Sequence, residues 1–442
     1  MKRFLSLVTF LAGSVTLVAG DLAKPTDHWP AWRGPSANGV APQSANPPTK
    51  WDATTNIQWK AEIPGRGSAT PIIWENQVFV VTAIKTDREA TADQLPKLAR
   101  LSEAKTNPPT HFYRFDVLSL DRNTGKVNWM QTATEAVPHE GHHPTHSYAA
   151  GSPTTDGKRL YVSFGSFGIF AYDLDGKLLW KRDLGRMQTR LGWGEAVSPV
   201  VHGGSLILNW DQEANSKLIV LDAATGKTRW EAKRDEKTSW NTPVVVEHAG
   251  KTQVIVNGTT RVRSYDLTDG TIIWEVGGMT TNAIPTPVVE NGVAYVMSGY
   301  RGAAALAVPL NSHGDLTDTN KVLWRYSKGT PYVPSPVLYH DRLYFTQANT
   351  QVLSVLNAKT GKPVVTDERL PGVMSFYASP VVAASRLYFV DRQGTTLVLK
   401  AGDEPEVLST NKLNDPIDAS PAIVGNQLFL RGEKYLYCIA EK

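Results

Sequence analysis

The sequence predicts an all-β fold, an eight-bladed β-propeller built from four-stranded antiparallel blades. Three observations lead to it. A Ser/Thr-Pro signature recurs along the chain at intervals of about 44 residues, which is the length of one propeller blade. The composition of 35 Gly, 28 Pro and 13 Trp suits many short strands separated by turns. A strand-like segment also precedes the first repeat without a blade of its own, while the last repeat is one strand short.

The Ser/Thr-Pro signature marks the start of each predicted blade, where an apolar run follows the proline. Its prolines are Pro71, Pro153, Pro199, Pro243, Pro287, Pro336, Pro380 and Pro421. Except for a first interval of 82 residues, neighbouring prolines lie 41 to 49 residues apart. Each repeat therefore has room for four short strands and their turns.

A second signature, Asp-x-x-Thr-Gly-x-x-x-Trp, marks the turn into the outer strand. It occurs at Asp121–Trp129 and Asp222–Trp230, with variants that end at Trp180 and Trp274. Asp caps a tight turn through its own backbone and Gly supplies a positive φ. We expect the recurring tryptophans to fill the gaps between blades. These are Trp129, Trp180, Trp230, Trp274 and Trp324.

Ring closure is predicted from the two ends of the repeat region, residues 56–442. The last unit ends after strands around Leu428–Leu430 and Tyr435–Ile439, and Asn56–Lys60 matches the missing outer strand. Pairing these segments removes two exposed sheet edges. It would also place Cys438 in the interior of the closing blade as a small buried side chain.

Three segments fall outside the repeat. Residues 21–55 are predicted to pack on the propeller as an N-terminal extension that wraps its outer face. Residues 85–110 form an insertion in the first blade, and Asp87–Lys105 has helix-compatible spacing. The polar stretch Asn311–Asn320 is predicted to be a solvated loop.

Residues 1–20 resemble a cleaved signal peptide, because Lys2 and Arg3 precede an apolar run that ends in small residues. We therefore expect a periplasmic or secreted protein with no transmembrane segment after removal of the leader. Cys438, the only cysteine, lies far from the leader, so a lipoprotein is not expected. With 46 basic against 42 acidic residues, the charge gives no indication of nucleic-acid binding.

These repeats, together with the segment Trp32-Arg33-Gly34-Pro35, resemble the pyrroloquinoline-quinone (PQQ)-binding-like β-propeller family. The resemblance covers nearly all of the chain beyond the leader. It implies the propeller fold, and it implies two unlike activities. One belongs to the quinoprotein alcohol and glucose dehydrogenases, which hold PQQ and calcium over the propeller axis. The other belongs to the propeller subunit of the outer-membrane β-barrel assembly machinery, a scaffold that binds partners.

In this fold two sets of loops share one face above the central channel, and they carry most of the unusual residues. A polar, partly planar ligand suits such a mixture of charged and aromatic groups. The candidate ligand-binding residues are Arg66, His146, Tyr148, Trp193, Glu195, Trp240, Asn241, Arg261, Asn282, Arg301, Tyr332, Tyr377, Arg392 and Arg431, and Asp418, Tyr300 and Lys434 lie in the same loops.

If the protein were a quinoprotein, Asp211 or Asp418 would act as the base. Glu195, Asn241, Asp211 and Glu213 would be candidate calcium ligands, although for Asp211 and Glu213 an ion pair with a nearby Arg is the favoured interpretation. The histidines at 139, 142, 143 and 146 surround Glu140 in a loop without metal-ligand spacing, which favours an exposed polar loop over a zinc site.

Three functions stay open on the sequence. The favoured one is a non-catalytic binding or scaffold propeller, with no cofactor and with a protein, small polar ligand or glycan as its partner. The second is a dehydrogenase that uses PQQ and calcium, and the third is a propeller that binds or cleaves polysaccharide. The sequence names no ligand and leaves the enzyme question undecided.

Overall fold

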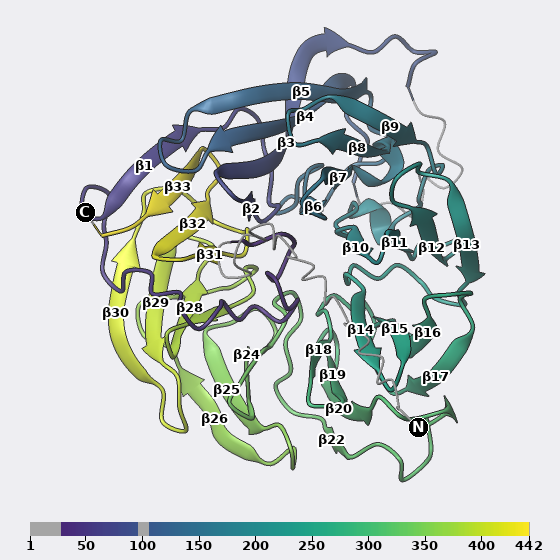
Figure 1. The fold of residues 1–442 in the computed structure, drawn as a ribbon, viewed down its shortest axis with the longest axis vertical. Helices are drawn as coiled ribbons and strands as arrows, with labels where there is room; N and C mark the ends of the chain where they lie inside the picture. Colours follow the sequence, from purple (N-terminus) through teal and green to yellow (C-terminus); the bar gives the residue numbers. More distant parts are fainter. Residues whose placement is uncertain (1–27, 96–105, 442) are drawn as a thin grey trace, which may run out of the picture.

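Eight four-stranded blades surround a central axis in the computed structural model, which describes residues 28–95 and 106–441 (Figure 1). The predicted fold class and blade count are confirmed. The signal peptide predicted at residues 1–20 lies outside the described residues.

The first four blades follow the chain from the inner strand outward. Blade 1 contains β2 (Ile72–Trp74), β3 (Gln77–Glu89), β4 (His111–Asp121) and β5 (Val127–Ala136). Blade 2 contains β6 (Thr154–Thr155), β7 (Arg159–Ser163), β8 (Ile169–Asp173) and β9 (Leu178–Arg182), with the short 3-10 helix η2 (Gly165–Phe167) between β7 and β8. Blade 3 contains β10 (Val200–His202), β11 (Ser205–Trp210), β12 (Lys217–Asp222) and β13 (Thr228–Lys233), and η3 (Arg190–Gly192) precedes it. Blade 4 contains β14 (Val244–His248), β15 (Lys251–Val256), β16 (Arg261–Asp266) and β17 (Ile272–Gly277).

The other four blades complete the ring. Blade 5 contains β18 (Val288–Glu290), β19 (Val293–Ser298), β20 (Ala304–Pro309) and β22 (Trp324–Tyr326). Blade 6 contains β23 (Val337–Tyr339), β24 (Arg342–Thr346), β25 (Val352–Asn357) and β26 (Pro363–Arg369), and blade 7 contains β27 (Val381–Ala383), β28 (Arg386–Val390), β29 (Thr395–Lys400) and β30 (Glu406–Lys412). Blade 8 contains β31 (Ala422–Val424), β32 (Gln427–Arg431) and β33 (Tyr435–Ile439), and β1 (Ile57–Glu62) is its outer strand.

The predicted closure is confirmed, because β1 pairs antiparallel with β33 and places Trp59 opposite Cys438. Cys438 is fully buried, as expected for a small core side chain. Figure 1 shows β1 beside the last strands, at the point where the two ends of the propeller meet.

The recurring tryptophans join neighbouring blades, as predicted. Each ring covers a positive-φ glycine of the next blade so closely that a Cβ there would lie 2.6–2.7 Å from it: Trp59 on Gly125, Trp129 on Gly176, Trp180 on Gly226, Trp230 on Gly270 and Trp324 on Gly361. In each pair the indole Nε1 also donates to a backbone carbonyl of the same turn, at 2.6–3.0 Å. Trp274 differs, because its Nε1 donates to Gln253 at 3.2 Å within its own blade.

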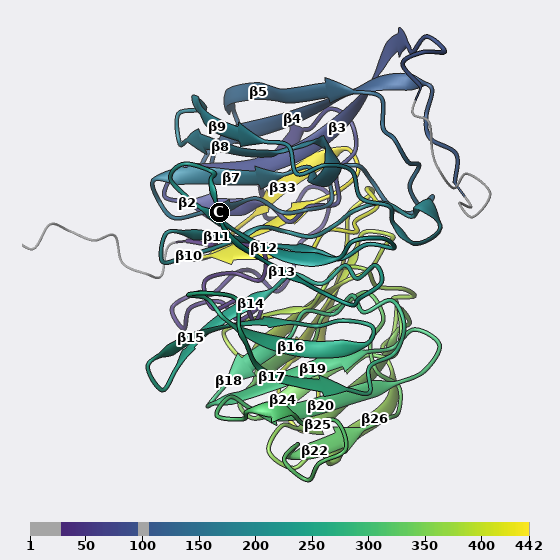
Figure 2. The same ribbon diagram turned by 90° about the vertical axis from the view of Figure 1, so that its right-hand side faces the viewer.

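Two expectations about the interruptions were wrong. β3 continues to Glu89 and pairs there with His111, so Asp87–Glu89 form a strand and not the start of a helix; residues 96–105 lie outside the described residues. Figure 2 shows this long hairpin projecting from the disc. The stretch Asn311–Asn320 is not simply solvated, because β21 (Gly314–Asp315) pairs with β17 and Leu316 is fully buried.

Residues 28–56 cross the propeller on the side of the turns between first and second strands (Figure 1). Trp29 exchanges backbone hydrogen bonds with Ile73 in blade 1, and Ala41 donates its N–H to Val382 in blade 7. Trp51 then reaches the outer strand of blade 7 through Asn411. The extension therefore spans the seam between blades 7, 8 and 1, and between these contacts it passes the central axis.

Candidate functional site

A cavity of about 420 Å³ opens on the propeller axis, on the face formed by the loops between blades. We call it the funnel. It combines a ring of hydroxyl groups, a wall of aromatic side chains and a floor supplied by the N-terminal extension. The lining residues that the sequence had singled out as loop candidates are His146, Trp193, Trp240, Tyr300, Tyr332, Tyr377 and Asp418.

The hydroxyl ring explains the Ser/Thr-Pro signature. In seven consecutive blade junctions, the backbone N–H of the Ser or Thr donates to the side-chain hydroxyl of the Ser or Thr in the next blade, at 2.9–3.2 Å. The residues are Thr70, Ser152, Ser198, Thr242, Thr286, Ser335, Ser379 and Ser420. The inner strand of a blade is a sheet edge, so its backbone N–H groups need acceptors outside the sheet, and the hydroxyl groups supply them. Proline is tolerated in the following position because it has no N–H group that would need an acceptor.

The aromatic wall consists of two stacked pairs. The Trp193 and Trp240 rings lie 6.4 Å apart at 29°, and the Tyr300 and Tyr332 rings lie 4.7 Å apart at 29°. Trp240 is fixed by a 2.8 Å hydrogen bond from its Nε1 to the carbonyl of Gly194. Flat, partly exposed rings of this kind offer stacking surfaces for a ligand.

Asp418 lines the funnel and pairs with Arg392. Arg392 Nε donates to Asp418 at 2.7 Å, and its Nη2 reaches the other carboxylate oxygen at 3.2 Å. The guanidinium also lies 4.0 Å from the Tyr377 ring centre. Burial raises the pKa of Asp418 despite this pairing. Both of its oxygens are engaged by Arg392, so the carboxylate is poorly placed to take up a substrate proton.

Trp32 and Arg33 close the funnel from below. Trp32 lines the cavity and its Nε1 donates to Ser420 at 3.4 Å. The buried guanidinium of Arg33 donates to the carbonyls of Pro336 at 2.6 Å and Pro380 at 2.7 Å. Burial lowers its pKa to about 9. The cation therefore occupies the carbonyl groups of the residues that precede inner strands β23 and β27.

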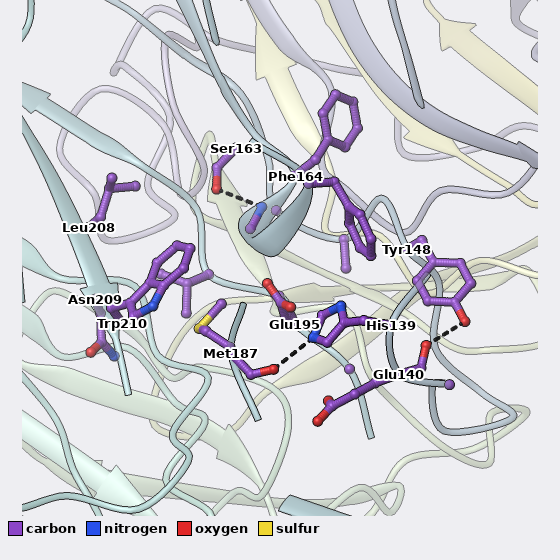
Figure 3. Close-up of a pocket in the computed structure, with 18 residues that line it drawn as sticks. His139, Glu140, Tyr148, Ser163, Phe164, Met187, Glu195, Leu208, Asn209 and Trp210 are labelled. Atoms are coloured by element: carbon purple, nitrogen blue, oxygen red, sulfur yellow. Dashed lines mark hydrogen bonds between the residues drawn. The ribbon is translucent and has the colours of Figure 1, made fainter. Parts of the chain in front are cut away.

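A smaller cavity of about 30 Å³ lies between blades 2 and 3 and the loops that precede them (Figure 3). His139 bonds to the carbonyl of Met187 at 2.7 Å, and Tyr148 donates to the carbonyl of Glu140 at 2.9 Å. The Glu140 carboxylate accepts hydrogen bonds from the N–H and the hydroxyl of Thr189. These contacts hold the loop that carries Trp193 against the preceding blade.

Glu195 lines the small cavity, where its carboxylate accepts the Ser166 N–H at 2.7 Å. Burial raises the pKa of Glu195 from 4.5 to about 7, against the effect of that hydrogen bond. Between these pH values the folded protein keeps a proton that the unfolded chain has lost. The contribution of Glu195 to stability therefore falls as the pH rises through this window.

The variant Glu195→Gln should be more stable than the parent at pH 8, by on the order of 2 kcal/mol, because the neutral amide still accepts the Ser166 N–H. At pH 4 the difference should disappear. Thermal unfolding of both proteins from pH 4 to pH 8 tests this. An equal gain at both ends of the range would show that the carboxylate charge is not the cause.

The histidine loop packs against its neighbours, so the expectation of an exposed polar loop was wrong. His142 and His143 are half-buried, and His146 bonds to the carbonyl of Glu195 at 3.1 Å. Burial lowers the pKa of His146 to about 4. Within residues 28–95 and 106–441, no group of three or more His, Cys, Asp or Glu side chains is arranged to hold a metal ion.

The four candidate calcium ligands do not converge. Asp211 forms a fully buried ion pair with Arg234 at 2.7 Å, which confirms the ion-pair interpretation. Glu213 accepts the N–H and hydroxyl of Thr238. Asn241 is buried in hydrogen bonds with Asn257. These residues, with Glu195, do not fit a calcium site, and Asp211 is too enclosed to serve as a base.

The remaining candidates lie around the funnel but not in it. Arg261 pairs with Asp315 and Glu275 at the side of blade 4. Asn282 is buried beside Tyr332 with a positive φ of 58°. Arg301 is exposed and lies 5.4 Å from the Tyr300 ring centre. Arg66 and Arg431 line a third cavity between blades 8 and 1.

Sequence reasoning missed several funnel residues. The sequence analysis used the Ser and Thr residues of the hydroxyl ring only as markers of the first strand of each blade. It used Trp32 only as part of a segment that resembles a known family. His143 and Thr145 also line the cavity.

Comparison with known proteins places the chain in a family. The family model described as outer membrane protein assembly factor BamB matches residues 114–316 and 259–441. The chain belongs to this family. The outer membrane protein assembly factor BamB of Legionella pneumophila (strain Paris) is 26% identical over 146 residues, which cover 33% of this chain and 34% of that protein. The match thus spans about a third of the curated relative.

Solved structures share the fold of this BamB-family chain. BamB from Moraxella catarrhalis superposes with a TM-score of 0.54 at 14% identity, over 83% of this chain and 98% of that one. A europium-containing methanol dehydrogenase superposes with a TM-score of 0.61 at 10% identity, over 92% of this chain and 89% of that one. Both a BamB and a methanol dehydrogenase therefore resemble the chain in architecture.

Proposed function

We propose that the protein is an exported, non-catalytic binding propeller that holds a ligand, or a segment of a partner, in the funnel. The observation that carries the proposal is the character of this cavity. Its wall offers stacked aromatic faces, while its acidic side chain, Asp418, is already paired with Arg392. Such a site is suited to recognition by shape and stacking.

Two further points support this assignment. The curated Legionella relative is described as an outer membrane protein assembly factor, and the predicted signal peptide would deliver this chain to the periplasm or beyond. No helix among the described residues is long and apolar enough to cross a membrane.

A dehydrogenase that uses PQQ and calcium is less well supported. The methanol dehydrogenase shares the fold, but Asp211, Glu213 and Asn241 are engaged in other contacts. A glycan-binding function is favoured by the stacked Trp and Tyr pairs, since sugar rings pack on aromatic faces. A glycan array tests this function. If the protein binds a glycan on the array and the variant that lacks Trp193 and Trp240 does not, the glycan binds in the funnel.

Photo-crosslinking tests the proposal in cells that produce the protein. A photoreactive residue at Tyr377, which lines the funnel, should give a discrete adduct that mass spectrometry identifies as protein, glycan or small molecule. The matched control is Leu178, an exposed residue on outer strand β9, where no such adduct should form. Replacing Trp193 and Trp240 by alanine should reduce the Tyr377 adduct at least tenfold, which corresponds to about 1.4 kcal/mol. Equal labelling at Tyr377 and Leu178 would contradict binding in the funnel.

A further inference from the structure

Five hydroxyl groups of the ring in the funnel have no acceptor for their own protons among the described residues. Each oxygen accepts a backbone N–H of the preceding blade, and these residues are only 2–6% exposed. The Ser420 oxygen also accepts the Trp32 indole N–H at 3.4 Å. Because buried hydroxyl groups are normally hydrogen-bonded, their protons need acceptors from a ligand or from water. The five residues are Ser152, Ser198, Thr242, Ser379 and Ser420.

Two aromatic N–H groups add to these donors. The Nδ1 of His143 accepts the backbone N–H of Thr145 at 3.3 Å, and burial lowers the pKa of His143. The neutral imidazole therefore carries its proton on Nε2. The indole N–H of Trp193 has no acceptor in the part of the chain that the structure describes, whereas that of Trp240 donates to Gly194. His143 and Trp193 both line the funnel, so its wall as well as its ring offers donors.

The strongest acceptors in and below the funnel are already occupied. Asp418 is the charged side chain among the described residues that line the cavity, and Arg392 donates to both of its carboxylate oxygens. Below the cavity, the carbonyl groups of Pro336 and Pro380 accept the guanidinium of Arg33. A ligand in the funnel therefore meets several free side-chain donors and, among the described lining residues, no unpaired charge.

This balance of donors and acceptors distinguishes between classes of ligand. Each sugar hydroxyl donates a proton as well as accepting one, and an ordinary peptide residue brings one N–H with each C=O. Proline has a carbonyl group but no N–H. Proline-rich segments adopt the polyproline II conformation, which has no internal hydrogen bonds, and they dock in grooves lined by aromatic side chains. The stacked pairs Trp193–Trp240 and Tyr300–Tyr332 provide such a surface.

We propose that the funnel binds a proline-rich segment of a partner protein in the polyproline II conformation. The proline rings pack on the tryptophan and tyrosine faces, and the main-chain carbonyl groups accept the free hydroxyl and indole protons. At about 420 Å³ the funnel has the size of a small-ligand site, so a short stretch of the segment lies inside it. This inference rests on the proposed function, because it specifies what the binding propeller holds.

Fluorescence polarisation with labelled peptides tests the proposal on the unaltered protein. An oligoproline peptide should bind saturably. A peptide of the same length in which every second proline is replaced by alanine regains N–H groups, and it should bind at least tenfold more weakly. Because the described lining has no unpaired charge, added sodium chloride should change the affinity for oligoproline by less than about twofold. Equal affinity for the two peptides, or a steep dependence on salt, would overturn the proposal.

Three variants place the peptide in the funnel. Trp193→Phe retains an aromatic face but loses one donor, so it should weaken oligoproline binding by about three- to tenfold. Replacing Trp193 and Trp240 together by alanine should weaken it further. The matched control Leu178→Ala, which alters an exposed residue of outer strand β9, should bind as the unaltered protein does. Unchanged binding in the double variant would overturn the proposal.

The crosslinking experiment at Tyr377 separates failure of this inference from failure of the proposed function. If oligoproline does not bind but the Tyr377 adduct contains a glycan or a small molecule, the inference is wrong and the binding propeller stands. If neither the peptide nor any crosslinked species is found in the funnel, both are wrong. A proline-rich protein segment in the adduct, together with saturable oligoproline binding, is the expected result.

Discussion

Replacing Asp211 by alanine should lower the free energy of unfolding by about 3–5 kcal/mol, because the change leaves a buried guanidinium without its counter-ion. Asp211 and Arg234 have fully buried side chains joined by two hydrogen bonds, at 2.7 and 3.1 Å. Arg234 also donates to Tyr265 of blade 4 at 2.8 Å. Burial alone would lower the pKa of Arg234, but the negative charge of Asp211 raises it overall. The guanidinium therefore stays charged. Urea unfolding followed by tryptophan fluorescence measures the loss.

An exposed pair supplies the control for this prediction. Asp403 pairs with Arg342, but its side chain is 62% exposed, so Asp403→Ala should lower the free energy of unfolding far less than Asp211→Ala does. The double replacement Asp211→Leu with Arg234→Met should recover most of the stability, since it removes both charges together. If Asp211→Ala and Asp403→Ala lowered the free energy of unfolding equally, the buried ion pair and its hydrogen bond to Tyr265 would not stabilise the contact between blades 3 and 4.

Replacing Trp59 by alanine should also cost about 3–5 kcal/mol, and it should open the ring at its seam. Trp59 lies in β1, is 8% exposed, and covers Gly125 of blade 1 while its Nε1 donates to the carbonyl of Arg122 at 2.7 Å. Because β1 and β33 are far apart in the chain and are held together by strand pairing and the contacts of Gln58, removing the Trp59 ring should release β1. Hydrogen exchange of the amides in Tyr435–Ile439 should then become faster.

Trp180 is the matched control, because it makes the same contact with Gly226 between blades that the chain connects directly. Trp180→Ala should destabilise the protein by a similar amount without faster exchange in β33. Unchanged protection of β33 in Trp59→Ala would show that β1 stays attached without this side chain.

The fold could be predicted closely because its determinants are local and repeated. The turn signature that ends in Trp129 or Trp230 specifies the strand order and the tryptophan that packs between neighbouring blades. Asn56–Lys60 could be recognised as a strand that belongs to no complete repeat. The insertion was less accessible. The helix-compatible spacing of Asp87–Lys105 gave no sign that β3 and β4 pair as far as Glu89 and His111, because a contact between strands outweighs local helix spacing.

The site could be predicted only in part, because the sequence shows which loops face the funnel but not how far each side chain reaches. Trp193, Trp240 and Tyr332 line the cavity, while Arg261 and Asn241, from equivalent loops, bind to their own neighbours. The floor was not foreseeable from the repeat, since Arg33 bonds to Pro336 and Pro380, some 300 residues or more away. The pairing of β1 with β33 is of similar range, but it could be predicted because the last repeat lacks a strand, whereas the contacts of Arg33 belong to no repeat.

Reconstitution with PQQ and calcium tests the proposed function most directly. The purified protein is incubated with both, and reduction of an artificial electron acceptor is followed with alcohols and aldoses as substrates. A binding propeller should show no substrate-dependent reduction above the level of the variant that lacks Trp193 and Trp240. Calcium-dependent turnover that this variant abolishes would contradict the account and identify the funnel as a quinoprotein active site.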